Sequence, residues 1–147
     1  MVKLMNKIDW IYIIDDTGAT IFSYEIHVQG SGNVSHALLS HFLFALQSIA
    51  KNLKDNETRT IEMSNNKFLL SKEKSTNYLF ILKSNRDANP QIIEPLLKQI
   101  QDKFVKKFLG YKNLFVDEKI ELLTSFKEDI RAILKEKSNI EKFSETI

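Results

Sequence analysis

The chain has 147 residues, of which 43% are apolar and 27% charged, and it includes ten phenylalanines, four tyrosines and one tryptophan. This composition suits one compact domain and excludes global disorder, because so apolar a chain can bury enough surface to offset its ordering entropy. The 21 basic and 19 acidic residues nearly balance, which argues against a nucleic-acid partner, and the absence of cysteine removes disulfides and thiolate metal ligands.

The first part of the chain predicts a β-hairpin followed by a helix. Residues 8–14 form an apolar, β-rich run that stops at the turn-forming segment 15–18. Residues 20–28 alternate polar and apolar side chains, as a half-buried strand does. A helix that begins near residue 35 and ends near residue 53 places its apolar side chains in one broad stripe. The stripe comprises Leu38, Leu39, Phe42, Leu43, Ala45, Leu46, Ile49, Ala50 and Leu53.

Three further strands are predicted in the middle of the chain. Residues 58–64 and 67–71 flank the pair Asn65-Asn66, which tolerates the positive φ of a tight hairpin turn. After another turn at residues 73–77, residues 78–82 are continuously apolar. Because the first and fifth strands lack a polar face, we expect them in the centre of the sheet, with the second and third strands at its edges.

Two helices are predicted to complete the chain. The regular part of the first starts just before Pro95, because Pro90 and Pro95 suit the first turn of a helix better than its interior. This helix is expected to end at Gly110, a residue type that is common just past a helix. The second helix spans about residues 117–137, and residues 138–147 form a tail that is either frayed or docked.

Sequence strings that could carry chemistry are better explained by local structure. Asp16-Thr17-Gly18 after an apolar strand is the local string of an aspartic protease, but one copy is present and about half of the chain reads as helix. We therefore expect Asp16 to be a structural residue of a turn. His36 and His41 are rotated by about 140° on a helix and cannot share a metal ion. The sequence predicts no catalytic residue, no cofactor, no metal site and no enzymatic activity.

Phe44 is the strongest candidate for a binding residue. It lies roughly opposite the middle of the apolar stripe, so it should be exposed if the stripe covers the sheet. A single exposed phenylalanine needs no function, but small neighbours would let a partner helix approach this one closely. The predicted protein interface comprises Ala37, Ser40, Phe44, Ser48 and Lys51 on the helix and Thr58, Thr60 and Glu62 on the third strand.

The order of elements resembles the longin or SNARE-like fold of longin domains, adaptor small subunits and transport-particle subunits. Residues 11–23 are similar to the opening hairpin of that family, and residues 38–46 are similar to its first helix. The resemblance implies an α+β sandwich in the order β-β-α-β-β-β-α-α within a single domain of residues 1–137. A five-stranded antiparallel sheet would carry one helix on one face and two helices on the other.

The resemblance also implies a function without catalysis. It points to a protein-interaction scaffold in membrane trafficking or small-GTPase regulation, which pairs with itself or with another longin-like or roadblock-like subunit. A small Ras-like GTPase is a further expected partner. The alternative is a small-molecule-binding sensor of the profilin-like or PAS-like type, which would need a pocket lined by convergent polar groups.

The location of the protein is predicted from what the sequence lacks. No apolar run reaches the roughly 18 residues of a membrane-spanning helix, and the first residues do not read as a secretory signal. We therefore expect a cytoplasmic protein with at most peripheral membrane contact. A lysine-rich strip comprising Lys98, Lys103, Lys106, Lys107 and Lys112 could contact anionic lipid, although lysine is also the usual solubilising residue of an exposed helix. No heptad SNARE motif follows the domain, so no fusogenic role is expected.

Overall fold

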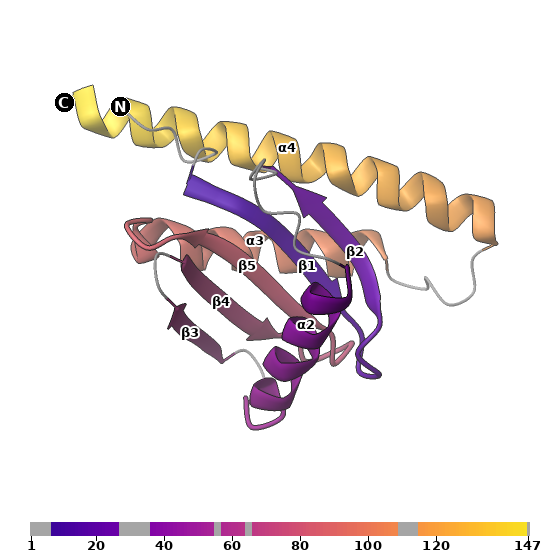
Figure 1. Cartoon of the computed structure of the whole chain (residues 1–147). Coiled ribbons are helices and arrows are strands. Elements are labelled where there is room, and N and C mark those ends of the chain that lie inside the picture. Colours follow the sequence, from indigo (N-terminus) through magenta and orange to yellow (C-terminus); the bar gives the residue numbers. More distant parts are fainter. Residues whose placement is uncertain (1–6, 27–35, 55–56, 64–65, 109–114, 147) are drawn as a thin grey trace. The chain divides into compact units, whose positions relative to one another are not determined.

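The computed structural model describes residues 7–26, 36–54, 57–63, 66–108 and 115–146, which fall into two compact units. The first, Asn6–Asp87, is the sheet unit, and the second, which contains Ala88–Ile147, is the helical unit. The sheet unit contains β1 (Ile8–Ile14), β2 (Thr20–Glu25), α2 (His36–Ala50), β3 (Thr58–Met63), β4 (Asn66–Lys72) and β5 (Leu79–Asn85). The helical unit contains α3 (Pro90–Lys107) and α4 (Val116–Thr146) (Figure 1). The predicted order β-β-α-β-β-β-α-α is confirmed.

All five strands belong to one antiparallel sheet in the order β2-β1-β5-β4-β3 (Figure 1). As predicted, β1 and β5 lie in the interior and pair with each other, while β2 and β3 form the edges. Every residue of β1 except Trp10 is buried, and the first four residues of β5 are buried as well. The apolar composition of these strands fits their interior position in the sheet.

One face of the sheet packs against α2. Leu43 and Leu46 of α2, with Leu53 just beyond the helix, share a buried cluster with alternate residues of three strands. Phe42 borders the cluster, and its ring centroid lies 4.8 Å from that of Phe68 on β4. The strand residues of the cluster are Tyr12, Ile14, Phe68, Leu70, Leu79 and Ile81.

The predicted apolar stripe of α2 is broader than the face that the sheet covers. Leu43, Leu46 and Leu53 are buried, as the stripe requires, but Ala45 is exposed and Ile49 retains 38% of its surface. The expectation that Ala45 and Ile49 belong to the core is therefore wrong. A single helix that crosses a sheet buries only the middle of such a stripe, and the residues at its margin stay in contact with water.

The turn between β1 and β2 is organised by Asp15. Its carboxylate accepts hydrogen bonds from the amide and hydroxyl of Thr17, at 2.9 and 2.6 Å, and from the amide of Ala19 at 3.0 Å. Burial tends to raise the pKa of Asp15, but these hydrogen bonds to the ionised form outweigh it and hold the pKa below its usual value. Gly18 supplies the positive φ of 93° that the turn requires. The segment is a hairpin turn as predicted, and Asp15 rather than Asp16 makes these side-chain bonds.

A second carboxylate organises the turn between β4 and β5. Glu73 is only 8% exposed, and its oxygens accept bonds of 2.7 to 3.0 Å from the amides and hydroxyls of Ser75 and Thr76. Asn77 closes the turn with a positive φ of 61°, and its amide donates to the Glu73 carbonyl at 2.9 Å. Burial tends to raise the pKa of Glu73, but the bonds from Thr76 and Ser75 prevail and lower the pKa from its usual 4.5.

We expect Glu73→Gln to lower the free energy of unfolding by about 1–3 kcal/mol at neutral pH and to flatten its pH dependence. A folded-state pKa below the unfolded value stabilises the protein above about pH 4.5, and this contribution is lost as the pH falls through the folded pKa. Urea unfolding of both proteins between neutral and acid pH measures the difference. The exposed carboxylate of Glu94 provides the control variant, Glu94→Gln. Parallel pH curves for wild type and Glu73→Gln would contradict the expectation.

The start of α3 differs from the prediction. Asn89 caps the helix by accepting a 3.0 Å bond from the amide of Gln91, and Pro90 occupies the first turn, where its missing amide is not needed. Pro95 therefore lies inside α3 instead of at its start. The helix ends at Lys107, where the amide of the capping residue Phe108 donates to the Phe104 carbonyl, and the predicted end at Gly110 lies outside the described residues.

The predicted end of the last helix is wrong. α4 continues through Ser138 and Asn139 to Thr146, so residues 138–146 extend the helix instead of forming a separate tail. The sequence between Asn139 and Thr146 contains no glycine or proline that would stop a helix, and its glutamates and lysine favour helix continuation. The side chains from residue 137 onward lie outside the described part of the structure.

Three phenylalanine rings join α3 to α4. Phe104 and Phe108 stack with their centroids 4.4 Å apart, and each meets Phe126 of α4 edge-on, at 5.4 and 5.7 Å. Beside them, Lys107 pairs with Asp129 at 2.5 Å and donates to the hydroxyl of Ser125. The helical unit thus combines an aromatic core with a partly buried ion pair.

Candidate functional site

The outer surface of α2 exposes an apolar patch around Phe44. Phe44 is 67% exposed, as its position opposite the core stripe predicted. It is accompanied by Ala45, Ser48 and Ile49, all exposed, and the hydroxyl of Ser48 donates to the Phe44 carbonyl at 3.3 Å. We call these four residues the α2 outer patch. Ile49 lies five residues from Phe44, about 140° around the helix, so it lies at the margin of the patch nearer the sheet.

Three other residues, Ala37, Ser40 and Lys51, were predicted to belong to the interface on this helix. The side chains of Ala37 and Ser40 lie outside the described residues, so their place beside Phe44 is untested. Lys51 is exposed just beyond the end of α2. A long lysine at the margin of an apolar patch can cover part of it with its methylene groups while keeping its charge in water.

Strand β3 provides an open sheet edge. It pairs with β4 on one side, and within the described part of the chain no strand pairs with its other side. An edge of this kind presents unpaired amide and carbonyl groups that another strand can bind. Charged side chains, Arg59 and Glu62, lie along it, as is common in edges that must not aggregate.

The side chains predicted on β3 do not share one surface with Phe44. Ile61 packs against the cluster beneath α2, so the alternating residues Thr58, Thr60 and Glu62 lie on the opposite face of the sheet. Among the β3 residues whose side chains the structure describes, Arg59 and Ile61 face the same side as α2. The alternation of side chains around Ile61 is visible in the sequence. It already indicates that Thr58, Thr60 and Glu62 lie on the face opposite to α2.

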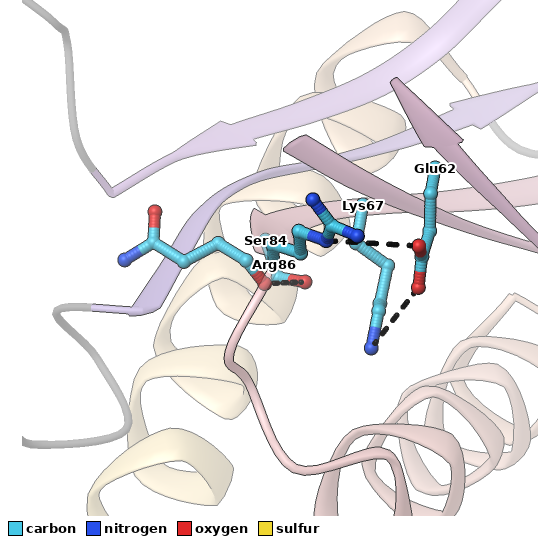
Figure 2. Close-up of polar contacts among 5 residues, drawn as sticks. Glu62, Lys67, Ser84 and Arg86 are labelled. Atoms are coloured by element: carbon cyan, nitrogen blue, oxygen red, sulfur yellow. Dashed lines mark hydrogen bonds and ion pairs between the residues drawn. The ribbon is translucent and has the colours of Figure 1, made fainter. Parts of the chain in front are cut away.

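A row of polar side chains crosses β3, β4 and β5 on the face away from α2. Glu62 is directly opposite Lys67, and Lys67 is directly opposite Ser84, with Arg86 just beyond β5. Figure 2 shows Lys67 and Arg86 approaching the Glu62 carboxylate from different sides. Sequence reasoning found only Glu62 of this row, because the register that aligns the strands is not visible in a single sequence.

Two further polar contacts tie neighbouring strands together. Asp9 of β1 and Lys83 of β5 form an ion pair of 2.7 Å with side-chain exposures of only 4% and 16%. The hydroxyl of Tyr12 donates to Glu25 of β2 at 3.2 Å, and burial, together with the nearby carboxylate, raises the pKa of Tyr12 to about 12. Both contacts lie between paired strands, where their contribution is structural.

Metal binding and lipid binding gain little support from the geometry. Within the described ranges, no group of three or more His, Asp or Glu side chains could hold a metal ion. A hollow of about 430 Å³ between α3 and α4 includes Lys103 and Lys106 of the predicted basic strip. Three carboxylates, those of Asp102, Asp129 and Glu136, line the same hollow. The surface is therefore of mixed charge, which does not favour an anionic lipid.

Comparison with other proteins adds no assignment. No protein-family model matches the chain, and none of the curated proteins is significantly similar to it. In the described residues, no helix combines the length and the apolar character needed to cross a membrane. The functional interpretation therefore depends on the α2 outer patch and the edge of β3.

Proposed function

We propose that this protein is a non-enzymatic interaction scaffold of the longin type. It acts in membrane trafficking or small-GTPase regulation by pairing with itself or with a longin-like or roadblock-like subunit, and a small Ras-like GTPase is its candidate further partner. Its place is the cytoplasm, with at most peripheral membrane contact. The observation that supports pairing is Phe44, a large apolar side chain that is 67% exposed on a helix whose other face is buried on the sheet.

The α2 outer patch and the β3 edge offer two complementary ways of binding. The patch provides an aromatic anchor, and such residues contribute strongly to binding when they are fully desolvated. The edge provides main-chain hydrogen bonds, which extend the sheet into the partner. Neither requires a reactive side chain, so a scaffold is the function that these features support best.

The charges on β3 restrict how a second copy could pair with it. In a symmetric dimer, the β3 strands of two copies would pair antiparallel about a two-fold axis normal to the sheet. Side chains directly opposite each other then lie on the same face of the joined sheet, so the register is centred on one residue, which lies opposite its own copy. A register centred on Arg59 or on Glu62 would therefore place two like charges opposite each other. Registers centred on Thr60 or Ile61 avoid this repulsion, and we expect one of these two in a symmetric dimer.

The variant Phe44→Glu tests the proposal. A charge at the anchor must be desolvated on association, so we expect it to weaken pairing by about 2 kcal/mol or more, which is roughly 30-fold in the dissociation constant. The melting temperature of the separated chains should hardly change, because an exposed substitution alters stability by about 0.5 kcal/mol or less. Phe115→Glu is the matched control, because Phe115 is 79% exposed just before α4, outside the patch.

Light scattering after size-exclusion chromatography, over a dilution series, measures the mass of all three proteins. A dimer in wild type and Phe115→Glu that is lost in Phe44→Glu supports the proposal. Equal loss in both variants would mean that any added charge disrupts association and would contradict the role of the α2 outer patch. A wild type that stays monomeric would exclude self-pairing and leave pairing with a different subunit as the form of the proposal to test.

A further inference from the structure

The polar row on the sheet contains a lysine that is unusually placed for its charge. Only 12% of the side-chain surface of Lys67 is exposed, and its Nζ lies 4.0 Å from the nearest Glu62 oxygen. Two other lysines with less than a fifth of their side-chain surface exposed, Lys83 and Lys107, behave differently. Lys83 contacts Asp9 at 2.7 Å, and Lys107 contacts Asp129 at 2.5 Å. Lys67 is thus a largely buried cation without a contact of that kind in the described part of the chain.

Arg86 approaches the same carboxylate and also stops short of it. Its Nε lies 3.8 Å from the second oxygen of Glu62, whereas charge-assisted hydrogen bonds are about 2.7–2.9 Å long. Two cations therefore share one carboxylate (Figure 2), which leaves a net charge of +1 on these three side chains, and neither cation is at direct hydrogen-bond distance from that carboxylate. Glu62 is half exposed near the end of an edge strand and can rotate into water.

We propose that Lys67 and Arg86 form a binding site for a phosphate group, and that the Glu62 carboxylate occupies this site when no phosphate is bound. A phosphate carries more charge than one carboxylate and offers oxygens in several directions, so it can bond to both cations at direct distance. Ser84 lies directly opposite Lys67, but its hydroxyl already donates to the Asn85 carbonyl at 3.1 Å and is not counted among the ligands. The phosphate can come as the free ion or as a small monoester.

This site is separate from the α2 outer patch, since it lies on the other face of the sheet. It does not depend on the proposed scaffold function, and Phe44→Glu should leave phosphate binding unchanged. Failure of one proposal can therefore be distinguished from failure of the other.

Titrations of the full-length chain with inorganic phosphate, glycerol 3-phosphate and acetate at constant ionic strength test the site. The readout is the backbone amide shifts of Lys67, Ser84 and Arg86 in NMR spectra. Glu62→Gln removes the competing charge but keeps the shape of the side chain, so we expect it to tighten phosphate binding about tenfold. Lys67→Met should weaken binding by about tenfold or more, and if this variant does not fold, Arg86→Gln replaces it because Arg86 is largely exposed.

Arg59→Gln is the matched control. Arg59 lies on the same strand as Glu62, on the other face, and makes a comparable contact of 3.8 Å with Glu57. Unchanged binding in this variant, together with tighter binding in Glu62→Gln, supports the site, and a preference for glycerol 3-phosphate over inorganic phosphate identifies a monoester as the ligand. Glu62→Gln binding no tighter than wild type, an equal effect of Arg59→Gln, or equal shifts with acetate would each overturn the proposal.

Discussion

Lys83→Met should lower the free energy of unfolding by about 3–5 kcal/mol, because it leaves the buried carboxylate of Asp9 without its cation. Asp9 and Lys83 are joined by a bond of 2.7 Å, and only 4% of the Asp9 side chain is exposed. Methionine fills a similar volume but cannot compensate a buried charge. Urea unfolding followed by the fluorescence of Trp10, the single tryptophan of the chain, reports directly on the sheet unit.

The position of Asp9 explains why this pair is buried at all. The pairing of β1 with β5 shifts between Ile8 and Trp10, so Asp9 is the extra residue of a bulge. A bulge changes the direction of one side chain. Here it turns Asp9, which lies between Ile8 and Trp10, toward Lys83 on the neighbouring strand. The carbonyl of Asp9 also accepts a 2.9 Å bond from the amide of Ile26, which fixes the bulge from the side of β2.

Two further variants separate a lost charge pair from lost packing. The double variant Asp9→Leu/Lys83→Met removes both charges and should recover most of the stability, since apolar replacements of a buried pair are often neutral or better. Lys74→Met, at an exposed position of the β4–β5 turn, should change the free energy of unfolding by about 0.5 kcal/mol or less. A double variant as unstable as Lys83→Met would show that the charge of Asp9 is not the cause.

The parts of the fold that the sequence predicted correctly are those that depend on local composition. The runs 10–14 of β1 and 78–82 at the start of β5 are continuously apolar, and this predicted that both strands lie inside the sheet. In the hairpin turns at Asp15 and Glu73, the carboxylates bind amides and hydroxyls two to four residues away, so the local sequence already contains the interacting groups. Phe44 was found on the exposed face because helical periodicity fixes azimuth within one element.

The parts that were missed depend on pairing between distant residues. Asp9 and Lys83 are 74 residues apart, and their contact requires both the register of β1 with β5 and a bulge. The row from Glu62 to Arg86 likewise needs the register of three strands, which no single strand specifies. The start of α3 was missed for another reason: the cap at Asn89 outweighs the cost of Pro95 inside the helix.

In the helical unit, Phe126→Ala should lower the free energy of unfolding by about 3–5 kcal/mol, whereas Phe115→Ala, just before the same helix, should lower it by about 0.5 kcal/mol or less. Phe126 has no exposed surface and contacts both Phe104 and Phe108 edge-on, so its removal leaves a cavity and ends two aromatic contacts. Phe115 is 79% exposed and has little packing to lose.

Two spectroscopic signals show which of the two units loses stability in Phe126→Ala. Circular dichroism at the helical band follows α3 and α4 strongly, while Trp10 follows the sheet unit. If Phe126→Ala lowers the denaturant midpoint of both signals equally, the units unfold together, and the aromatic core of the helices stabilises the whole chain. If only the helical signal moves, each unit unfolds separately, as a pair of independently packed cores would. A Phe126→Ala variant no less stable than Phe115→Ala would contradict the packing of α3 on α4, because a cavity in a closely packed core cannot be free of cost.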